Sequence, residues 1–422
     1  MDAKKANAPE AEETKISKPA EIEKMLAIPP ADISIIELLD AIIEKAYDMR
    51  ASDIHFDPRE NAMMTRFRID GVLHNMFSIP QILQSEIITR IKVSAGLRTD
   101  EHHAAQDGRF RMTLPKTKFD IRVSIAPTYY GENAELRLLT EQGQDFTLGE
   151  IGFSERDLAT VDHAIKKPYG MILATGPTGS GKTTTLYTIL KILDTEDVSI
   201  ITIEDPIEYS IESIDQIQVN PQTGLTFANG LRSILRQDPN IIMVGEIRDE
   251  ETANIAVNAA LTGHLLLSTL HTNDAATTLP RLIDMKVEPF LIASTVNIAI
   301  GQRLVRKICD ACKAERKLLP AELERLATIV PPDLLKHLKS NPLYMGKGCV
   351  ACSNTGYFGR IGVHEVLEMS EVIRDAVVKR ASASEIRTIA VREGMTTMLE
   401  DGIDKVLRGV TSIEEVLRVT HE

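Results

Sequence analysis

The sequence lacks any long hydrophobic run. No stretch of its 422 residues approaches the roughly 18 consecutive apolar residues that a membrane-spanning helix needs. The first residues, Met1–Lys5, are not followed by the apolar segment of a secretion signal. We therefore expect a cytoplasmic protein.

An excess of positive charge is also lacking. Lysine and arginine number 48 against 61 aspartates and glutamates, which gives a formal net charge of −13. Because proteins that wrap duplexes neutralise phosphates with clustered basic residues, this balance argues against a nucleic-acid partner. The composition, 43% hydrophobic and 26% charged, is that of an ordinary globular protein, and the length predicts two or three domains.

Cysteine is scarce, but the four that exist fall in two C-x-x-C pairs. They are Cys309, Cys312, Cys349 and Cys352. In a reducing compartment such pairs indicate a metal before a disulfide. Four thiolates suit tetrahedral zinc with no open coordination position, so we expect a structural Zn²⁺ site. Four unrelated buried thiols and a redox pair are the alternatives.

The most informative stretch is a glycine-rich turn between a predicted strand, residues 171–175, and a predicted helix, residues 184–193. The turn fits the pattern G-x-x-x-x-G-K-[ST] and consists of Gly176, Pro177, Thr178, Gly179, Ser180, Gly181, Lys182 and Thr183. Glycines leave backbone N–H groups free to surround phosphate oxygens, and the helix N-terminus adds positive charge. We expect Lys182 to contact the β- and γ-phosphates and Thr183 to hold Mg²⁺, with Thr184 completing the nucleotide-binding set.

Acidic residues follow two further predicted strands. The runs 198–203 and 241–245 are short and apolar, as strands buried on both faces of a parallel sheet are. Glu204 and Glu246 come directly after them, where ligands of open α/β sheets bind. We predict that these two glutamates activate the attacking water and that Glu246 also coordinates Mg²⁺. For a neighbouring acid such as Asp249, a helix cap or a surface ion pair is the alternative.

Two histidines and two arginines are weaker candidates. His264 and His271 flank a predicted strand at a spacing that is not typical of a metal site, so each is either structural or functional. Arg232 and Arg236 lie four residues apart, so a helix would present both on one face. They are either surface arginines or charges for a γ-phosphate, which one subunit could supply to another.

The sequence divides into segments of different character. The fold class that we predict is α/β: a phosphate-loop core with a mainly parallel sheet, preceded by a small α+β domain with an antiparallel sheet. The predicted segments are a solvated tail at 1–30, the α+β domain at 31–140, a linker at 141–150, the nucleotide-binding core at 151–305, a tetracysteine zinc module at 306–369 and C-terminal helices at 370–422.

With these motifs in place, the chain resembles the secretion-superfamily ATPases, the hexameric motors of type II secretion and type IV pilus assembly. Residues 176–183 correspond to the Walker A loop of that family, 203–208 to its Asp box, 243–249 to its atypical Walker B segment and 263–273 to its His box. Weaker similarity extends over 51–55, 66–73 and 106–109.

The resemblance implies a RecA-like core that hydrolyses ATP with Mg²⁺ and a first domain that is PAS-like. It implies that Arg122 and Arg137 of the first domain reach the bound phosphates when that domain closes. It also brings the remaining candidates to the nucleotide: Arg232, Arg236, Arg248, His264 and His271. The four cysteines resemble those of the assembly and secretion branch, whereas pilus-retraction motors generally lack this module.

Partners follow from the same resemblance. We expect a homohexamer that is cytoplasmic and meets the inner membrane through a platform protein. A pilus-retraction motor, a DNA-translocating or conjugative ATPase, and a nucleotide-gated scaffold without turnover are the alternatives. Two departures from the family pattern stand out. Members of this branch often carry an additional N-terminal domain, whereas we expect only the solvated tail before residue 31, and the usual Gly-Glu-Arg run reads Gly131-Glu132-Asn133.

Overall fold

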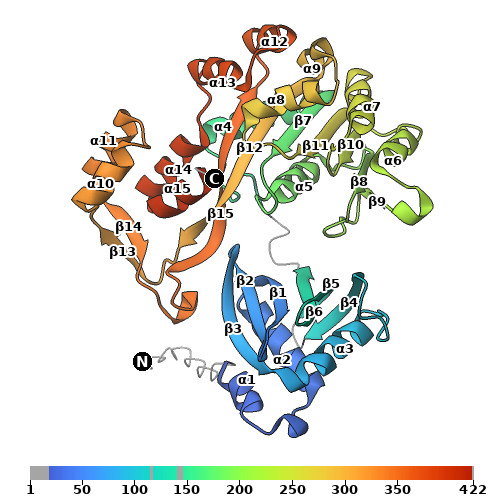
Figure 1. Ribbon diagram of the computed structural model, residues 1–422. Coiled ribbons are helices and arrows are strands. Elements are labelled where there is room, and N and C mark those ends of the chain that lie inside the picture. Colours follow the sequence, from blue (N-terminus) through green and yellow to red (C-terminus); the bar gives the residue numbers. More distant parts are fainter. Residues whose placement is uncertain (1–18, 115–116, 140–145, 421–422) are drawn as a thin grey trace, which may run out of the picture. The chain divides into compact units, whose positions relative to one another are not determined.

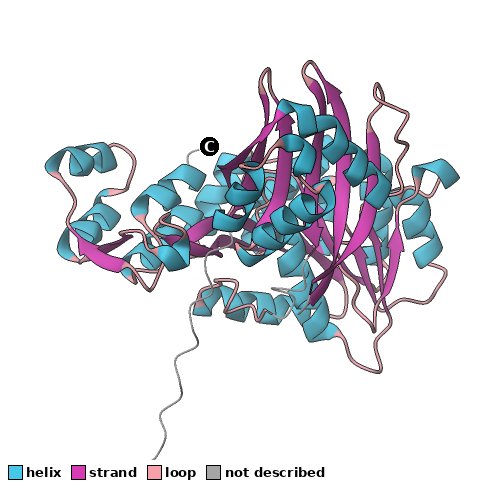
Figure 2. Cartoon of the chain, turned by 90° about the horizontal axis from the view of Figure 1, so that it is seen from below, coloured by secondary structure: helices cyan, strands magenta, loops and turns pink. Residues whose placement is uncertain are grey.

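The computed structural model describes residues 19–114, 117–139 and 146–420, which form two compact units that divide between Glu141 and Gln142 (Figure 1). Most of the expected tail at 1–30 and part of the expected linker at 141–150 lie outside the described residues. Figure 2 shows helices in cyan and strands in magenta. Among the described residues, no helix is both long and apolar enough to cross a bilayer.

Unit 1 is built on a six-stranded antiparallel sheet with the strand order β3-β2-β1-β6-β5-β4. Its elements are α1 (Pro19–Leu26), α2 (Ile35–Asp48), β1 (Ala51–Pro58), β2 (Ala62–Ile69), β3 (Val72–Pro80), α3 (Gln84–Ser94), β4 (Gln106–Leu114), β5 (Thr117–Thr128) and β6 (Gly131–Leu139). Helices α2 and α3 contribute to the same core as the strands. The predicted α+β fold with an antiparallel sheet is confirmed.

Local sequence explains several of these elements. In β5, buried Phe119, Ile121 and Val123 alternate with more exposed residues, so one face of the sheet meets the helices and the other meets solvent. The turn between β2 and β3 has positive φ at Asp70 (49°) and Gly71 (86°), as a two-residue hairpin turn requires. Strands β2 and β3 therefore form a tight antiparallel hairpin.

Helix α1 differs from the expected solvated tail. Its Ile22 is only 1% exposed, and Met25 and Leu26 pack against the same core. Residues i, i+3 and i+4 share one helix face, so three apolar side chains suffice to dock this helix on unit 1. Sequence composition alone concealed this stripe because the surrounding residues are charged.

Unit 2 is built on a seven-stranded sheet with the order β15-β12-β7-β11-β10-β8-β9, parallel except at the β12–β15 pair. The strands, with the separate β13–β14 hairpin, are β7 (Gly170–Thr175), β8 (Ile200–Glu204), β9 (Asp215–Gln218), β10 (Ile241–Val244), β11 (Leu265–Leu270), β12 (Val296–Ile308), β13 (Lys313–Arg316), β14 (Leu343–Gly346) and β15 (Tyr357–Glu368). The helices are α4 (Glu155–Ile165), α5 (Lys182–Leu193), α6 (Phe227–Ile234), α7 (Glu250–Leu261), α8 (Ala275–Asp284), α9 (Pro289–Thr295), α10 (Pro320–Ala327), α11 (Pro332–Ser340), α12 (Glu371–Val378), α13 (Ala383–Arg392), α14 (Met398–Leu407) and α15 (Ile413–Thr420).

The central strands of unit 2 are buried on both faces. In β7, Met171 and Leu173 belong to the core shared with α7, α8 and α9, whereas Ile172 and Ala174 belong to the core shared with α4 and α5. Successive strand residues point to opposite faces, so a continuous apolar run supplies two cores at once. The predicted mainly parallel sheet with helices on both faces is confirmed.

The β12–β15 pair crosses the predicted segment boundaries. β12 continues through residue 305, and β15, which was expected in the cysteine module, pairs with β12 from Ile298 opposite Glu368 to Ile308 opposite Tyr357. The pairing runs between strands that are far apart in sequence, so local periodicity gave no sign of it. The cysteine module is therefore carried on a ribbon that continues the core sheet.

Gly346 tests the packing at the base of the cysteine module. A Cβ at this position would lie 1.9 Å from the carbonyl oxygen of Gly356 and 2.6 Å from its Cα, both backbone atoms. We expect Gly346→Ala to lower the thermal midpoint by about 5 °C, because overpacking against backbone costs about 2 kcal/mol. Gly149→Ala is the control, since its nearest neighbour would be Thr147 Oγ1 at 4.0 Å. Equal melting curves, recorded by circular dichroism, would contradict this packing.

Candidate functional site

The glycine-rich loop connects the end of β7 to the start of α5, as the pattern predicts. Gly176, Gly179 and Gly181 have φ values of 147°, 76° and 89°, in the region that favours glycine. The segment from Pro177 to Gly179 is exposed, whereas Ser180 is buried. The loop therefore lies at the carboxyl edge of the parallel sheet with its tip open to solvent.

Lys182 is folded back on its own loop. Its Nζ donates to the carbonyl oxygens of Gly176 and Pro177, both at 2.9 Å, and the residue is only 8% exposed. Burial lowers the pKa of the Lys182 ammonium to about 8, although the nearby Glu246 carboxylate opposes that shift. Because the pKa of Lys182 is only about 8, changes in its burial or in nearby charges alter the fraction of the side chain that is protonated.

Two residues that sequence reasoning missed support the loop from below. The Nε2 of Gln302, on β12, donates to the carbonyl oxygen of Ser180 at 2.7 Å, and its Oε1 accepts from Thr185 Oγ1 at 2.9 Å. A Cβ on Gly176 would lie 2.5 Å from the Gln302 carbonyl oxygen. A glutamine inside the apolar run of β12 was the available signal, because a buried amide needs specific partners.

Glu246 lies beyond β10 at the same edge as the loop. It is 8% exposed, forms an ion pair with Arg248, and has its Oε2 3.2 Å from Nε2 of His271. A hydrogen bond to Glu246 is the main cause of the raised pKa of Arg248, and Glu246 also attracts Lys182. The structure therefore brings four predicted residues together: Lys182, Glu246, Arg248 and His271.

The segment that carries His271 is tied to the strand that carries the loop. Thr175 Oγ1, at the end of β7, lies 3.1 Å from the carbonyl oxygen of Leu270 and accepts from the backbone N–H of Thr272 at 3.1 Å. This hydroxyl fixes the residues on either side of His271. The position of the histidine thus depends on the same strand as the loop.

Glu204 is fully engaged inside the protein. It is 2% exposed, and its oxygens accept from Tyr187 Oη, from Thr202 Oγ1 at 2.6 Å and from Gln216 Nε2 at 3.1 Å. Burial, reinforced by the negative charge of Glu204, raises the pKa of Tyr187 far above its ordinary value. These contacts tie α5 to β8 and β9.

His264 lies at the opposite end of β11 from the loop. β7 and β11 are parallel, with Gly170 opposite Leu265 and Thr175 opposite Leu270, and the loop follows Thr175. His264 precedes Leu265, and its Nδ1 contacts the Ala259 carbonyl oxygen at 2.9 Å. The structure therefore does not bring His264 to the loop of its own chain, because the length of β11 separates them.

Arg232 and Arg236 have local partners. Arg232 forms an ion pair of 2.6 Å with Glu251, in the first turn of α7, and Arg236 donates to the Arg232 carbonyl oxygen at 2.9 Å. Helix α6 ends at Ile234, so Arg236 lies just beyond the helix that was expected to carry both. Asp249 caps α7 by accepting from the Thr252 N–H at 2.8 Å, which is the structural alternative given above.

The two arginines predicted in the first domain lie side by side in unit 1. Arg122 on β5 is directly opposite Arg137 on β6, and both belong to the solvent-facing side of the sheet. Arg122 is exposed, whereas Arg137 forms an ion pair with Asp53 at 2.9 Å. Two adjacent cations on a free sheet face are suited to binding an anion.

The four cysteines come together as one cluster. All four Sγ atoms lie within 4.8 Å of one another. The Cys309–Cys349 and Cys312–Cys352 sulfur distances are both 3.8 Å. Zinc–sulfur bonds of about 2.3 Å give a tetrahedral edge of about 3.8 Å, so the cluster can hold one metal ion. The N–H groups of Cys349 and Gly356 also donate to Cys352 Sγ, at 3.2 and 3.3 Å.

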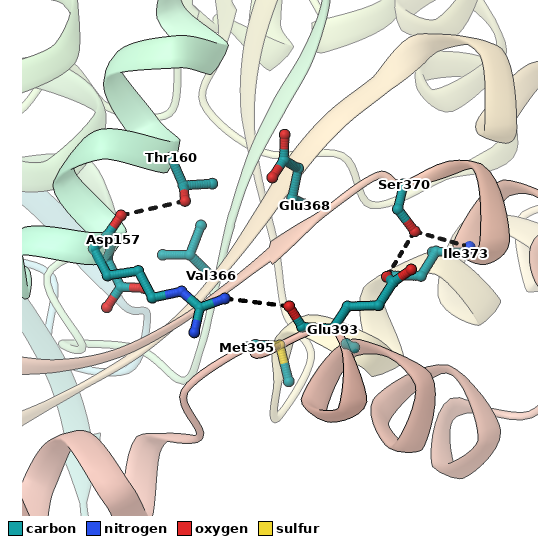
Figure 3. Close-up of a pocket in the computed structure, with 10 residues that line it drawn as sticks. Asp157, Thr160, Val366, Glu368, Ser370, Ile373, Glu393 and Met395 are labelled. Carbon is teal, nitrogen blue, oxygen red and sulfur yellow. Dashed lines mark hydrogen bonds between the residues drawn. The ribbon is translucent and has the colours of Figure 1, made fainter.

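A separate pocket of about 400 Å³ lies between α4, β15, α12 and α13 (Figure 3). Its lining includes Arg156, which donates to the Glu393 carbonyl oxygen at 3.3 Å, and Ser370, which donates to the Glu393 carboxylate at 2.7 Å. Glu368, also in the lining, pairs with Ile298 near the start of β12, whereas the loop follows the end of β7. The pocket contains no residue of the predicted site.

Comparison with known proteins adds a family and relatives. The model of the family described as "Type II/IV secretion system protein" matches residues 31–418. The chain is 48% identical over 394 residues to the type II secretion system protein E of Xanthomonas campestris pv. campestris, covering 93% of this chain and 68% of that protein. It is 47% identical to the type IV pilus assembly ATPase PilB of Thermus thermophilus, covering 90% of this chain but only 42% of that protein.

Solved structures show the same fold. The Legionella pneumophila ATPase DotB matches with a TM-score of 0.66 at 23% identity, over 94% of this chain and 98% of DotB. The pilus retraction motor PilT with bound ADP matches with a TM-score of 0.61 at 25% identity, over 91% of this chain and 97% of PilT. The predicted fold class is confirmed by these matches.

The lowered pKa of Lys182 predicts a pH dependence for nucleotide binding. Phosphate favours the charged ammonium and raises its pKa, so binding takes up a proton when the pH is near or above 8. We expect the affinity for ADP to fall about tenfold between pH 7 and pH 9, because a pKa near 8 leaves little ammonium at pH 9. Calorimetry in two buffers of different ionisation heat measures the proton uptake. Lys182→Arg, whose guanidinium does not titrate here, should show none. Uptake that persists in this variant would assign the proton to another group.

Proposed function

We propose that this chain, which belongs to the Type II/IV secretion system protein family, is an ATP-hydrolysing motor of type IV pilus assembly or type II secretion. The observation that carries the proposal is that the loop and Glu246 lie at one edge of the parallel sheet, where Glu246 pairs with Arg248 and His271 and its charge acts on Lys182. A phosphate loop alone accounts for binding, and the acid beside it adds a group that can activate water. The names of the relatives support the cellular role.

The loop residues divide the work of binding. Backbone N–H groups from Thr178 to Thr183 would surround the phosphates, and Lys182 would exchange its two carbonyl partners for phosphate oxygens. Thr183 and Glu246 would hold Mg²⁺, which neutralises developing phosphate charge when it is bound. Thr184 completes this set at the start of α5.

We assign water activation to Glu246 and a positioning role to Glu204. Glu246 lies by the loop lysine and shares its carboxylate with a histidine and an arginine that are each about half exposed. Glu204 already accepts three side-chain hydrogen bonds in the interior. Turning Glu204 toward a water would leave buried donors unpaired, at a cost of about 1–3 kcal/mol each.

The remaining arginines would act between domains or between copies of the chain. We propose that Arg122 and Arg137 bind the γ-phosphate when unit 1 closes, and that Arg232 and Arg236 act on the nucleotide of a neighbouring copy. A homohexamer accommodates both roles. His264, which lies away from its own loop, would have a role only at such a boundary.

The cysteine cluster supports the assembly and secretion branch, with Zn²⁺ as its ion. The relatives named for secretion or pilus assembly are 43–48% identical, whereas the retraction motor is 25% identical. We further propose the predicted division into domains at 31–140, 151–305, 306–369 and 370–422, with β15 of the third segment returning to the core sheet beside β12. The partners would be further copies of the chain and an inner-membrane platform protein, and the motor would work at the cytoplasmic side of that membrane.

Glu246→Gln tests the enzymatic proposal. We expect kcat for ATP hydrolysis to fall by a factor of about 10² to 10³, because loss of a general base typically costs that much. The matched control is Glu250→Gln, which removes a carboxylate from the first turn of α7 that pairs with Lys286 at 2.7 Å. Phosphate release should be measured on the isolated oligomer.

Two results would overturn this reading. Full activity in Glu246→Gln would remove the water-activating role. A larger kcat loss in Glu204→Gln than in Glu246→Gln, with unchanged melting, would transfer that role to Glu204.

Metal analysis tests the cysteine cluster. We expect one zinc per chain, and we expect Cys312→Ser to lose most of it, because three thiolates leave the tetrahedron incomplete. Ser353→Ala, next to Cys352 but outside the cluster, should keep the full amount. Zinc absent from the unsubstituted protein would favour the retraction branch instead.

A further inference from the structure

The solvent face of the unit 1 sheet carries a row of charged residues across five strands. The register places Arg109 of β4 opposite Arg122 of β5, and Arg122 opposite Arg137 of β6. It continues with Arg137 opposite Asp53 of β1. Asp53 is in turn opposite Arg68 of β2. Like charges directly opposite one another destabilise a sheet, so this row needs a compensating group.

Asp53 supplies the compensating negative charge. The residue is 4% exposed, although it stands on the solvent side of the sheet. Its Oδ1 accepts from Nε of Arg137 at 2.9 Å, and its Oδ2 lies 3.4 Å from Nε of Arg68. The hydroxyl of Ser52 donates to the same Oδ2 at 2.7 Å. One buried carboxylate is thus bound to two arginines that are themselves partly exposed.

The contact fixes one side of the Arg137 guanidinium. Asp53 Oδ1 accepts from Nε of Arg137, and Oε1 of Glu135 lies 3.6 Å from Nη2 of the same arginine. A guanidinium held at Nε by a buried carboxylate loses most of its freedom to rotate about its long side chain. Its charge therefore remains at a set position above the sheet, next to Arg122.

We propose that Asp53 is a positioning residue for phosphate recognition: it orients Arg137 for contact with the γ-phosphate of bound ATP. The inference rests on the proposed role of Arg137 at that phosphate. The positioning role accounts for the similarity of residues 51–55, the Ala-Ser-Asp-Ile-His stretch, to the family. The nucleotide loop and its acids do not explain that similarity. Asp53 does not touch the nucleotide itself.

A purely structural ion pair would behave differently, and unit 1 contains one for comparison. Asp120 pairs with Arg111 at 2.7 Å across β5 and β4, on the same face of the sheet but outside the row. Both pairs are cross-strand Arg–Asp contacts. Only the Asp53 pair includes an arginine that the proposed function uses.

The test is a double-mutant cycle on the full-length oligomer with ATP and Mg²⁺. We expect Asp53→Asn to lower kcat about tenfold while KM changes less than about twofold, because the charge of Arg137 is kept but its placement is lost. In an Arg137→Ala background, Asp53→Asn should have no further effect, as residues that act through one another are not additive. Asp120→Asn should leave kcat unchanged.

A milder variant covers the case in which Asp53→Asn folds poorly. Ser52→Ala removes only the hydroxyl that donates to Asp53, and we expect a kcat loss of about twofold that also vanishes in the Arg137→Ala background. Melting curves for all variants show whether a loss of kcat is a loss of folded protein.

The outcomes separate the two levels of the argument. If Arg137→Ala lowers kcat and Asp53→Asn does not, or if the two losses multiply, the positioning role is wrong and the proposed function stands. If Arg137→Ala leaves kcat unchanged, the phosphate role of Arg137 is wrong, and the positioning role falls with it.

Discussion

The site depends on the support that β12 gives to the nucleotide loop. The side-chain amide of Gln302 holds the loop at Ser180 and the first turn of α5 at Thr185, and its backbone carbonyl lies against Gly176. A buried amide with both ends satisfied resists displacement, because each lost hydrogen bond leaves a polar group unpaired. β12 also pairs with β15, and the ribbon continues to the cysteine module. The loop is therefore connected through β12 and its β15 partner to the cysteine module, which is distant from it in sequence.

The charged groups near the loop interact with one another through Glu246. Glu246 pairs with Arg248 and His271, and its negative charge opposes the lowering of the Lys182 pKa that burial causes. A change in the position of this one carboxylate therefore alters its contacts with Arg248 and His271 and the pKa of Lys182 together.

The local features of the fold could be predicted from the sequence. The strand–turn–helix around Gly176 and the hairpin at Asp70-Gly71 each depend on a few adjacent residues, so a local sequence pattern is enough to predict them. Contacts between distant segments could be predicted only where a motif marks both partners, as in the cysteine cluster. No sequence pattern near Glu204 indicates that its carboxylate accepts hydrogen bonds from Tyr187 and Gln216. The sequence therefore did not predict that these buried contacts occupy Glu204. His264 was misjudged as a neighbour of the loop for a related reason. Proximity in a motif does not say which end of a strand a residue occupies.

The hydrogen bonds of Lys182 have a consequence for the affinity of the loop. Its ammonium already donates to two carbonyl oxygens of the loop, those of Gly176 and Pro177. A phosphate that binds this lysine must compete with both acceptors, so the net gain from the new contacts is smaller than their number suggests. The same two carbonyl oxygens restrict the lysine to the loop, which lowers the entropy that its long side chain loses when a phosphate binds.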